Sequence, residues 1–288
     1  MHPGQADLTA TTVAALVSHQ YPHWRDLPVT PIVSHGTVNA LHRLGDDIVL
    51  RFPLQPVTRP DPLRAEQDHA RRLQPHVPVA LPEPLALGEP GEGYAGYWTA
   101  YRWIDGRTAT PHDIDPAHLA RVATAIHHVD TGGQPWNGHS RGGPLAGQDE
   151  WVRHSLHQSR RLTDTAALTH IWQDCLHAPL HKGPAVWIHA DLMPGNLLVR
   201  DGHLHAVIDL GAVCTGDPAV DHIPAWNLFD AAERATYRQA LDAGDASWQR
   251  GRGWALVQAI GALWYYTDTN PAMADNARTT LTALLEDR

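Results

Sequence analysis

Residues 186–211 constrain the fold of this chain more than any other stretch. An apolar run at 186–188 leads into a polar loop, and the Asp201-Gly202 pair that follows is a strong signal for a two-residue hairpin turn. Strands are therefore predicted on either side of the turn, over 197–199 and 204–208.

Three oxygen-bearing side chains lie in or next to this hairpin. Asp191 and Asn196 fall in the loop before it, and Asp209 directly follows its second strand. Two carboxylates and an amide suit oxygen coordination of Mg²⁺ together with a base for a hydroxyl group. The alternative is a set of loop-forming polar residues around an ordinary hairpin, but the complete set, in this order and at these spacings, favours a catalytic site.

The spacing His-x-Asp-x-x-x-x-Asn, followed by Asp-x-Gly, is the catalytic-loop and metal-loop pattern of kinases. The stretch resembles the aminoglycoside phosphotransferase family of protein-kinase-like small-molecule kinases in HADLMPGN (189–196), VIDLG (207–211) and GDPAVD (216–221). The resemblance implies an α+β, two-lobed protein-kinase-like fold. A small β-rich, nucleotide-binding N-lobe would span residues 1–104, and a larger, mainly helical C-lobe with the catalytic loop would span residues 105–288.

The resemblance also implies roles for the motif residues. Asp191 would accept the proton of the attacking hydroxyl, and His189 would hold the shape of the loop by hydrogen bonding. Asn196 and Asp209 would hold Mg²⁺ against the phosphates of ATP or GTP. The later carboxylates, Asp217 and Asp221, are expected to cap and brace the loop.

The nucleotide side follows from the same resemblance. Arg51 stands where the family has the strand lysine that holds the phosphates, a departure that puts the usual phosphate geometry in doubt. Glu66 would orient Arg51, Gly36 would belong to a turn over the phosphates, and the backbone from Arg102 to Ile104 would meet the nucleotide base. A surface arginine, a solvated glutamate and a simple turn glycine are the alternatives.

Periodicity and capping residues predict the remaining elements. A strand is expected over 97–104, and residues 131–147, which are rich in glycine and proline, are expected to form a long loop. Helices are predicted over 7–19, from Pro62 with Asp61 as cap, from Asp115-Pro116, over 148–162, 165–177, 226–241 and 246–267, and after the cap Asn270.

The acceptor is read from weaker signals. Trp264, Tyr265 and Asp268 could line a cleft for a ringed, cationic ligand, although aromatic residues at helical spacing are more often core. From residue 201 to 288 there are 12 acidic against 6 basic residues, which favours a cationic acceptor or serves solubility alone.

Composition limits the partners, the metal sites and the cellular location that we expect. A net charge of −9 argues against nucleic acid as the main partner. Two cysteines make neither a disulfide framework nor a zinc site, and the 21 histidines include no HExxH motif or Cys/His cluster. No signal peptide is evident, and no apolar run approaches the roughly 18 residues of a membrane span. We expect a soluble cytoplasmic protein without a membrane partner.

The function predicted is Mg²⁺-dependent transfer of the γ-phosphate of ATP or GTP to a hydroxyl of a small molecule. An aminoglycoside or related cationic antibiotic is the leading acceptor. The alternatives are a metabolic kinase of the choline, homoserine or fructosamine type, and a nucleotide-binding protein without transfer activity, for which the missing strand lysine is the main support.

Overall fold

The computed structural model describes residues 8–33 and 38–287, which divide into two compact units. The N-terminal unit holds the described part of Met1–Pro75 together with Ala80–Asp105. The C-terminal unit holds His76–Val79 and the chain from Gly106 onward. Within the described residues, no helix is both long and apolar enough to span a membrane.

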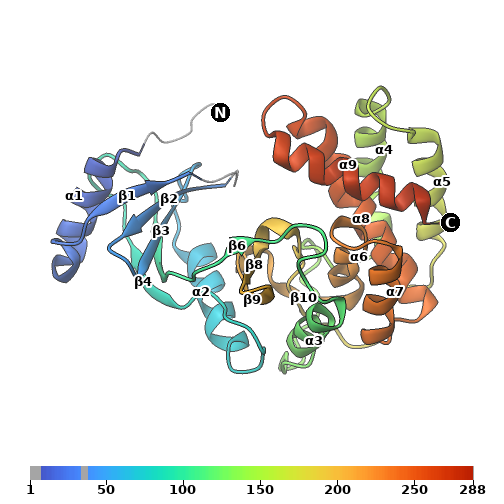
Figure 1. Ribbon diagram of the computed structural model, residues 1–288, viewed down its shortest axis with the longest axis horizontal. Helices are drawn as coiled ribbons and strands as arrows, with labels where there is room; N and C mark the ends of the chain where they lie inside the picture. The colour runs from blue at the N-terminus through green and yellow to red at the C-terminus, as the bar shows by residue number, and fades with distance from the viewer. Residues whose placement is uncertain (1–7, 34–37, 288) are drawn as a thin grey trace. The chain divides into compact units, whose positions relative to one another are not determined.

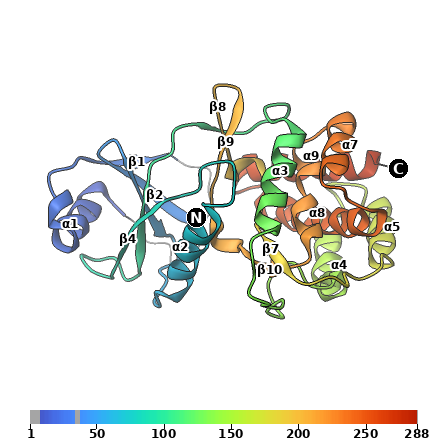
Figure 2. The same ribbon diagram turned by 90° about the horizontal axis from the view of Figure 1, so that it is seen from below.

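The N-terminal unit is built on one antiparallel sheet of five strands in the order β1-β2-β3-β5-β4 (Figure 1). Helices α1 and α2 lie on opposite sides of this sheet in both ribbon views (Figures 1 and 2). The elements are β1 (Val29–Ile32), β2 (Asn39–Leu44), β3 (Ile48–Pro53), β4 (Pro84–Gly88), β5 (Trp98–Arg102), α1 (Ala10–Gln20) and α2 (Asp61–Leu73).

Alternation along β3 decides which side chains face which helix. Leu50 and Phe52 point into the core beneath α1, where Phe52 stacks on Trp98 at a ring-centroid distance of 5.2 Å. Arg51 lies between them in sequence and so projects from the opposite face of the sheet, the face that α2 covers. Burying Leu50 and Phe52 therefore fixes the direction of Arg51.

The C-terminal unit is mainly helical, with two small antiparallel sheets. One sheet pairs β7 (Val186–Ile188) with β10 (Cys214–Gly216), and the other has β6 (Arg107–Thr108), β8 (Leu197–Arg200) and β9 (His203–Val207) in the order β6-β8-β9. The helices are α3 (Pro116–His127), α4 (Asp149–Gln158), α5 (Thr165–Leu176), α6 (Pro224–Asn227), α7 (Ala231–Ala240), α8 (Asp245–Tyr266) and α9 (Pro271–Glu286).

Helix α8 is the centre of this unit, because α4, α5 and α9 all pack against it. It also packs against η5, the 3₁₀ segment Pro218–His222. The approach is close at Gly251, where a Cβ atom would lie 2.5 Å from Cβ of His222 and 2.9 Å from the Ala219 carbonyl oxygen. A side chain at this position would push α8 away from η5.

Several sequence predictions are confirmed. The hairpin of β8 and β9 turns at Asp201-Gly202, with Arg200 paired to His203. Asp115 caps α3 by accepting from the Ala117 N–H, and Asn270 caps α9 by accepting from the Met273 N–H.

Two predictions are wrong. Asp61 is not the cap of α2 but its first residue; Pro60 takes the cap position, and the Asp61 carboxylate accepts a hydrogen bond from Nε of Arg59. The helix expected over 226–241 is interrupted after α6, and Asp230 starts α7 through a reciprocal capping box with Glu233.

The buried Asp217–Arg250 ion pair joins η5 to α8, with both side chains less than one tenth exposed. We expect Asp217→Ala to lower the free energy of unfolding by roughly 3–5 kcal/mol, because it leaves the buried Arg250 guanidinium without its carboxylate partner. The exposed pair of Asp275 and Arg278 supplies the control. Asp275→Ala should cost less than about 1 kcal/mol in the same urea titration. Equal costs for the two variants would contradict this account.

Candidate active site

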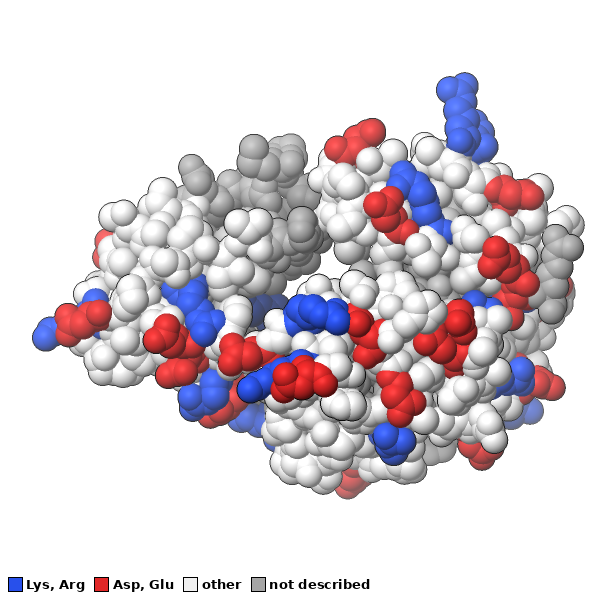
Figure 3. Space-filling model, viewed as in Figure 1, with Lys and Arg blue, Asp and Glu red and all other residues white. Residues whose placement is uncertain are grey.

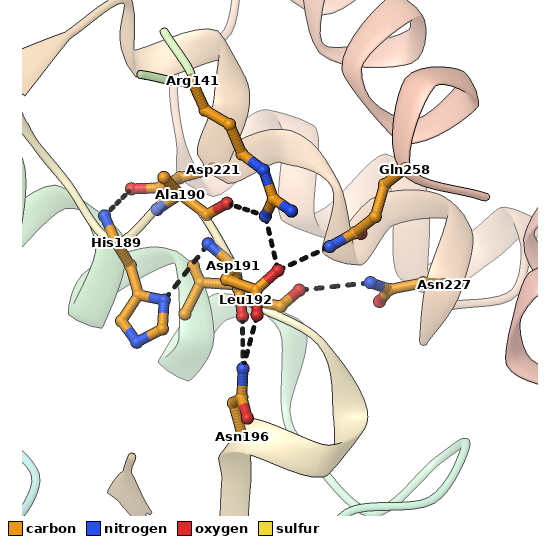
Figure 4. Close-up of polar contacts among 9 residues, drawn as sticks. All are labelled: Arg141, His189, Ala190, Asp191, Leu192, Asn196, Asp221, Asn227 and Gln258. Carbon is orange, nitrogen blue, oxygen red and sulfur yellow. Dashed lines mark hydrogen bonds and ion pairs between the residues drawn. The ribbon is translucent and has the colours of Figure 1, made fainter. Parts of the chain in front are cut away.

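The loop that follows β7 is held in place by one buried carboxylate. Asp221 accepts hydrogen bonds from the backbone N–H groups of His189, at 3.0 Å, and Ala190, at 2.9 Å (Figure 4). Ala190 has a φ of 64°, in the left-handed region that a residue with a Cβ rarely adopts. The two bonds to Asp221 stabilise this strained turn, and Asp191 follows it directly.

Asp221 is itself fully enclosed and satisfied. Its carboxylate lies 3.0 Å from Nε2 of His127, and its carbonyl oxygen accepts from the Tyr237 hydroxyl at 2.7 Å. Burial alone would raise the pKa of Asp221, but the His127 hydrogen bond and charge, the His189 charge and the Ala190 N–H together bring this pKa below its usual value. Asp221, which we call the brace of the loop, is therefore an ionised carboxylate.

The Asp191 carboxylate is held by three side chains (Figure 4). Its Oδ1 accepts from Nη1 of Arg141 at 2.5 Å and from Nε2 of Gln258 at 2.6 Å. Its Oδ2 accepts from Nδ2 of Asn196 at 2.9 Å. His189 adds a backbone contact, since its Nδ1 accepts from the Asp191 N–H at 3.3 Å. The carboxylate is thus held in one orientation by groups of the protein itself.

The hairpin brings the backbone next to Asp209 into contact with that of Asn196. The Ile208 N–H donates to the Asn196 carbonyl oxygen at 2.8 Å, so Asp209 directly follows the residue that faces Asn196. The Asn196 amide nitrogen is committed to Asp191, which leaves its amide oxygen for another partner. An amide oxygen and a carboxylate are ligands that Mg²⁺ accepts, so these residues fit a magnesium site.

Arg51 and Glu66 meet in the N-terminal unit. Nη1 of Arg51 donates to Oε1 of Glu66, and the two side chains are 15% and 8% exposed. The Arg51 guanidinium also lies 5.5 Å from the ring centroid of Tyr101. The ion pair expected from the sequence is thus present, with its arginine fixed on the α2 side of the sheet.

The remaining predicted nucleotide residues are placed less decisively. Gly36 lies outside the described residues. The Arg102 side chain pairs with Glu83 on the surface, and its backbone N–H donates to the Glu83 carbonyl oxygen at 2.9 Å. That N–H is therefore used within the unit, whereas the Ile104 N–H has no acceptor among the described residues.

The predicted substrate residues separate on α8. Trp264 packs against α4, with ring-centroid distances of 6.2 Å to Trp151 and 5.6 Å to His154. Tyr265 is 43% exposed and lies seven residues after Gln258, so it shares the helix face that reaches Asp191. Asp268 is exposed beyond the end of α8. Of the three, Tyr265 is the one that α8 places on the Asp191 side.

Comparison with known proteins decides the family. The sequence matches the phosphotransferase enzyme family over residues 31–255, which is most of the chain. The chain belongs to the phosphotransferase enzyme family. A search of curated protein sequences finds no match.

Solved phosphotransferase structures share the fold. The GDP complex of aminoglycoside 2'-phosphotransferase-IIIa matches with a TM-score of 0.73 and 17% identity, over 98% of this chain and 100% of that one. A thermostable mutant of APH(4)-Ia with AMP-PNP and hygromycin B matches with a TM-score of 0.67 and 20% identity, over 96% and 98%. The macrolide 2'-phosphotransferase MphH from Brachybacterium faecium gives 0.60 and 20%, over 94% and 97%. The kinase-like α+β fold predicted from the sequence is confirmed.

Sequence reasoning missed three residues of this candidate site. Arg141 and Gln258 bind the Asp191 carboxylate, and Nδ2 of Asn227 donates to the Leu192 carbonyl oxygen at 3.1 Å. Arg141 lies in the loop that was expected to have no periodic structure. Gln258 offered one signal, a polar residue within an otherwise apolar stretch of a long helix.

His222, which follows Asp221 in the chain, is expected to make the stability of the fold depend on pH. Burial lowers the pKa of His222 from 6.5 to about 4. Between these values the unfolded chain binds a proton that the folded chain does not, so stability should fall as the pH drops through this window. The full loss is about 3 kcal/mol.

His222→Phe keeps a ring against Trp248 and cannot be protonated. Denaturant titrations between pH 7 and 4 should show a shallower loss of stability for this variant than for the unchanged chain, where roughly that pH range spans the two pKa values. Identical pH dependence of the two chains would contradict the assignment.

Proposed function

We propose that this chain transfers the γ-phosphate of ATP or GTP, with Mg²⁺, to a hydroxyl group of a small molecule. One observation carries the proposal: three side chains donate hydrogen bonds that immobilise the Asp191 carboxylate. One of the three, Asn196, also accepts at its carbonyl oxygen from the N–H of Ile208, the residue before Asp209. Phosphoryl transfer depends on positioning and charge neutralisation more than on covalent chemistry by the protein, and a rigid base beside a metal-binding pair meets that need.

The residues divide the task. Asp191 orients the acceptor hydroxyl and takes its proton, and the freed oxygen lone pair forms the bond to the γ-phosphorus. The bond from that phosphorus to the β–γ bridging oxygen breaks, and its electron pair leaves with the nucleoside diphosphate. Arg51, oriented by Glu66, holds the phosphates as the family lysine would, with a forked rather than a point contact.

Asn196 and Asp209 would hold the metal, which supplies positive charge against the nucleotide phosphates when bound. Their fit rests on the amide oxygen that Asn196 has left after bonding Asp191, and on the hairpin that brings Asp209 beside it.

The leading acceptor is an aminoglycoside or related cationic antibiotic. Structural neighbours include complexes of aminoglycoside phosphotransferases with kanamycin and with hygromycin B, and a macrolide phosphotransferase. The acidic excess after residue 200 supports a cationic acceptor, although acidic and basic groups are interspersed on the visible face of the C-terminal unit (Figure 3).

Both cysteines are free thiols, in keeping with a cytoplasmic setting.

The test is γ-phosphate transfer from ATP and GTP to a panel of aminoglycosides, macrolides, peptide antibiotics and small metabolites. We expect Mg²⁺-dependent transfer to an antibiotic, and Asp191→Ala should lower turnover by at least about 10³-fold, because the base is lost. The folded fraction, measured by circular dichroism, should be retained.

Asp209→Ala is the matched variant for the metal and should abolish Mg²⁺-dependent nucleotide binding. Full turnover by Asp191→Ala would overturn the assignment of the base. Transfer only to a metabolite would replace the antibiotic acceptor, and nucleotide binding without transfer to any hydroxyl compound would mean a binding protein.

A further inference from the structure

Arg141 is the one cation bonded to the Asp191 carboxylate within the described residues. Its Nη1 donates both to Oδ1 of Asp191, at 2.5 Å, and to the carbonyl oxygen of Ala190, at 2.7 Å. A single nitrogen thus ties the carboxylate to the strained residue that precedes it in the chain. The Arg141 side chain is 41% exposed, so this contact is not imposed by burial.

The backbone around Arg141 is locked in place by close packing. Cα of Gly216 would lie 3.1 Å from a Cβ atom built at Gly142, which has a φ of 92°. The Gly142 carbonyl oxygen accepts from the Asp217 N–H at 2.9 Å, and the Arg141 carbonyl oxygen accepts from Sγ of Cys214 at 3.4 Å. The loop is therefore fastened to the segment that leads into η5, and Arg141 is presented from a fixed backbone.

The hydrogen bonds to the two Asp191 oxygens are unequal. Oδ1 accepts from Arg141 and from Gln258, which uses both of its lone pairs. Oδ2 accepts only from Asn196 among the described residues, which leaves one lone pair open. A hydroxyl that donates to this carboxylate can therefore do so at Oδ2 without displacing a protein donor.

We propose that Arg141 is a positioning residue that, together with Gln258, saturates Oδ1 of Asp191 and reserves Oδ2 for the acceptor hydroxyl. The inference rests on the proposed phosphotransfer function. Proton transfer then runs from the hydroxyl oxygen to Oδ2, the oxygen on the Asn196 side, while the hydroxyl oxygen bonds to the γ-phosphorus and the nucleoside diphosphate leaves. Without Arg141 the carboxylate can rotate and present either oxygen.

The experiment compares Arg141→Ala, Arg141→Lys and Gln258→Ala in the transfer assay with the best acceptor of the panel, or with water as acceptor by nucleotide hydrolysis. Arg141→Ala should lower kcat by about 10²-fold, the scale expected when a catalytic group is misplaced by about 1 Å. KM for the nucleotide should stay within about threefold, because Arg141 contacts Asp191, the proposed proton acceptor, and not the proposed phosphate-binding residues. Gln258→Ala should show a smaller fall in kcat.

Rescue separates positioning from a merely structural role. Millimolar guanidinium should restore part of the turnover of Arg141→Ala, and Arg141→Lys should fall between that variant and the unchanged chain. Arg278→Ala, which removes an exposed arginine on α9, is the control and should change neither kcat nor its response to guanidinium.

Each outcome decides one claim. If Asp191→Ala abolishes turnover but Arg141→Ala keeps kcat within about threefold, the inference is wrong and the proposed function stands. A fall in kcat that guanidinium does not reverse and that parallels a loss of folded protein also overturns the inference. If Asp191→Ala retains turnover, the proposed function itself fails.

Discussion

The site depends on one buried carboxylate. Asp221 accepts two consecutive backbone N–H groups, from His189 and Ala190, and so holds a left-handed turn that the side chain of Ala190 disfavours. A buried charge is costly unless it is fully paired, and His127 completes the pairing. Because Asp191 follows the turn directly, the direction of the carboxylate proposed as the base is set by a group that is fully buried.

The same brace connects the site to the core of the C-terminal unit. Asp221 belongs to η5, which packs against α8 at Gly251. Gln258 lies seven residues further along α8, on the same helix face, and reaches Oδ1 of Asp191. The missing side chain at Gly251 allows the close approach, and the helix then delivers Gln258 to the carboxylate two turns later. The packing of α8 against η5 therefore also determines the geometry of the loop that carries Asp191.

The sequence was sufficient where structure is set by neighbours in the chain. The hairpin at Asp201-Gly202 and the cap Asn270 follow from turn and capping chemistry over a few residues. The same chemistry marks the break in the predicted helix: Asp230 and Glu233 have the spacing of a capping box, and α7 starts there.

Elsewhere local rules were ambiguous or silent. A proline fits either of the first two positions of a helix, so Pro62 could not show whether Asp61 caps α2 or begins it. Arg141 and Gln258 bond to Asp191 across 50 and 67 residues of chain, and no periodicity encodes such contacts. These contacts depend on the packing of Gly142 against Gly216 and of α8 against η5.

The most direct measurement on the central claim is the turnover of Asp221→Asn per folded molecule. An asparagine keeps the size of the side chain but can no longer accept from both N–H groups, so the turn at Ala190 should relax. We predict that kcat falls by at least about 10²-fold, while circular dichroism still reports a folded chain. Turnover equal to that of the unchanged chain would contradict the account, because Asp191 would then hold its position without the brace.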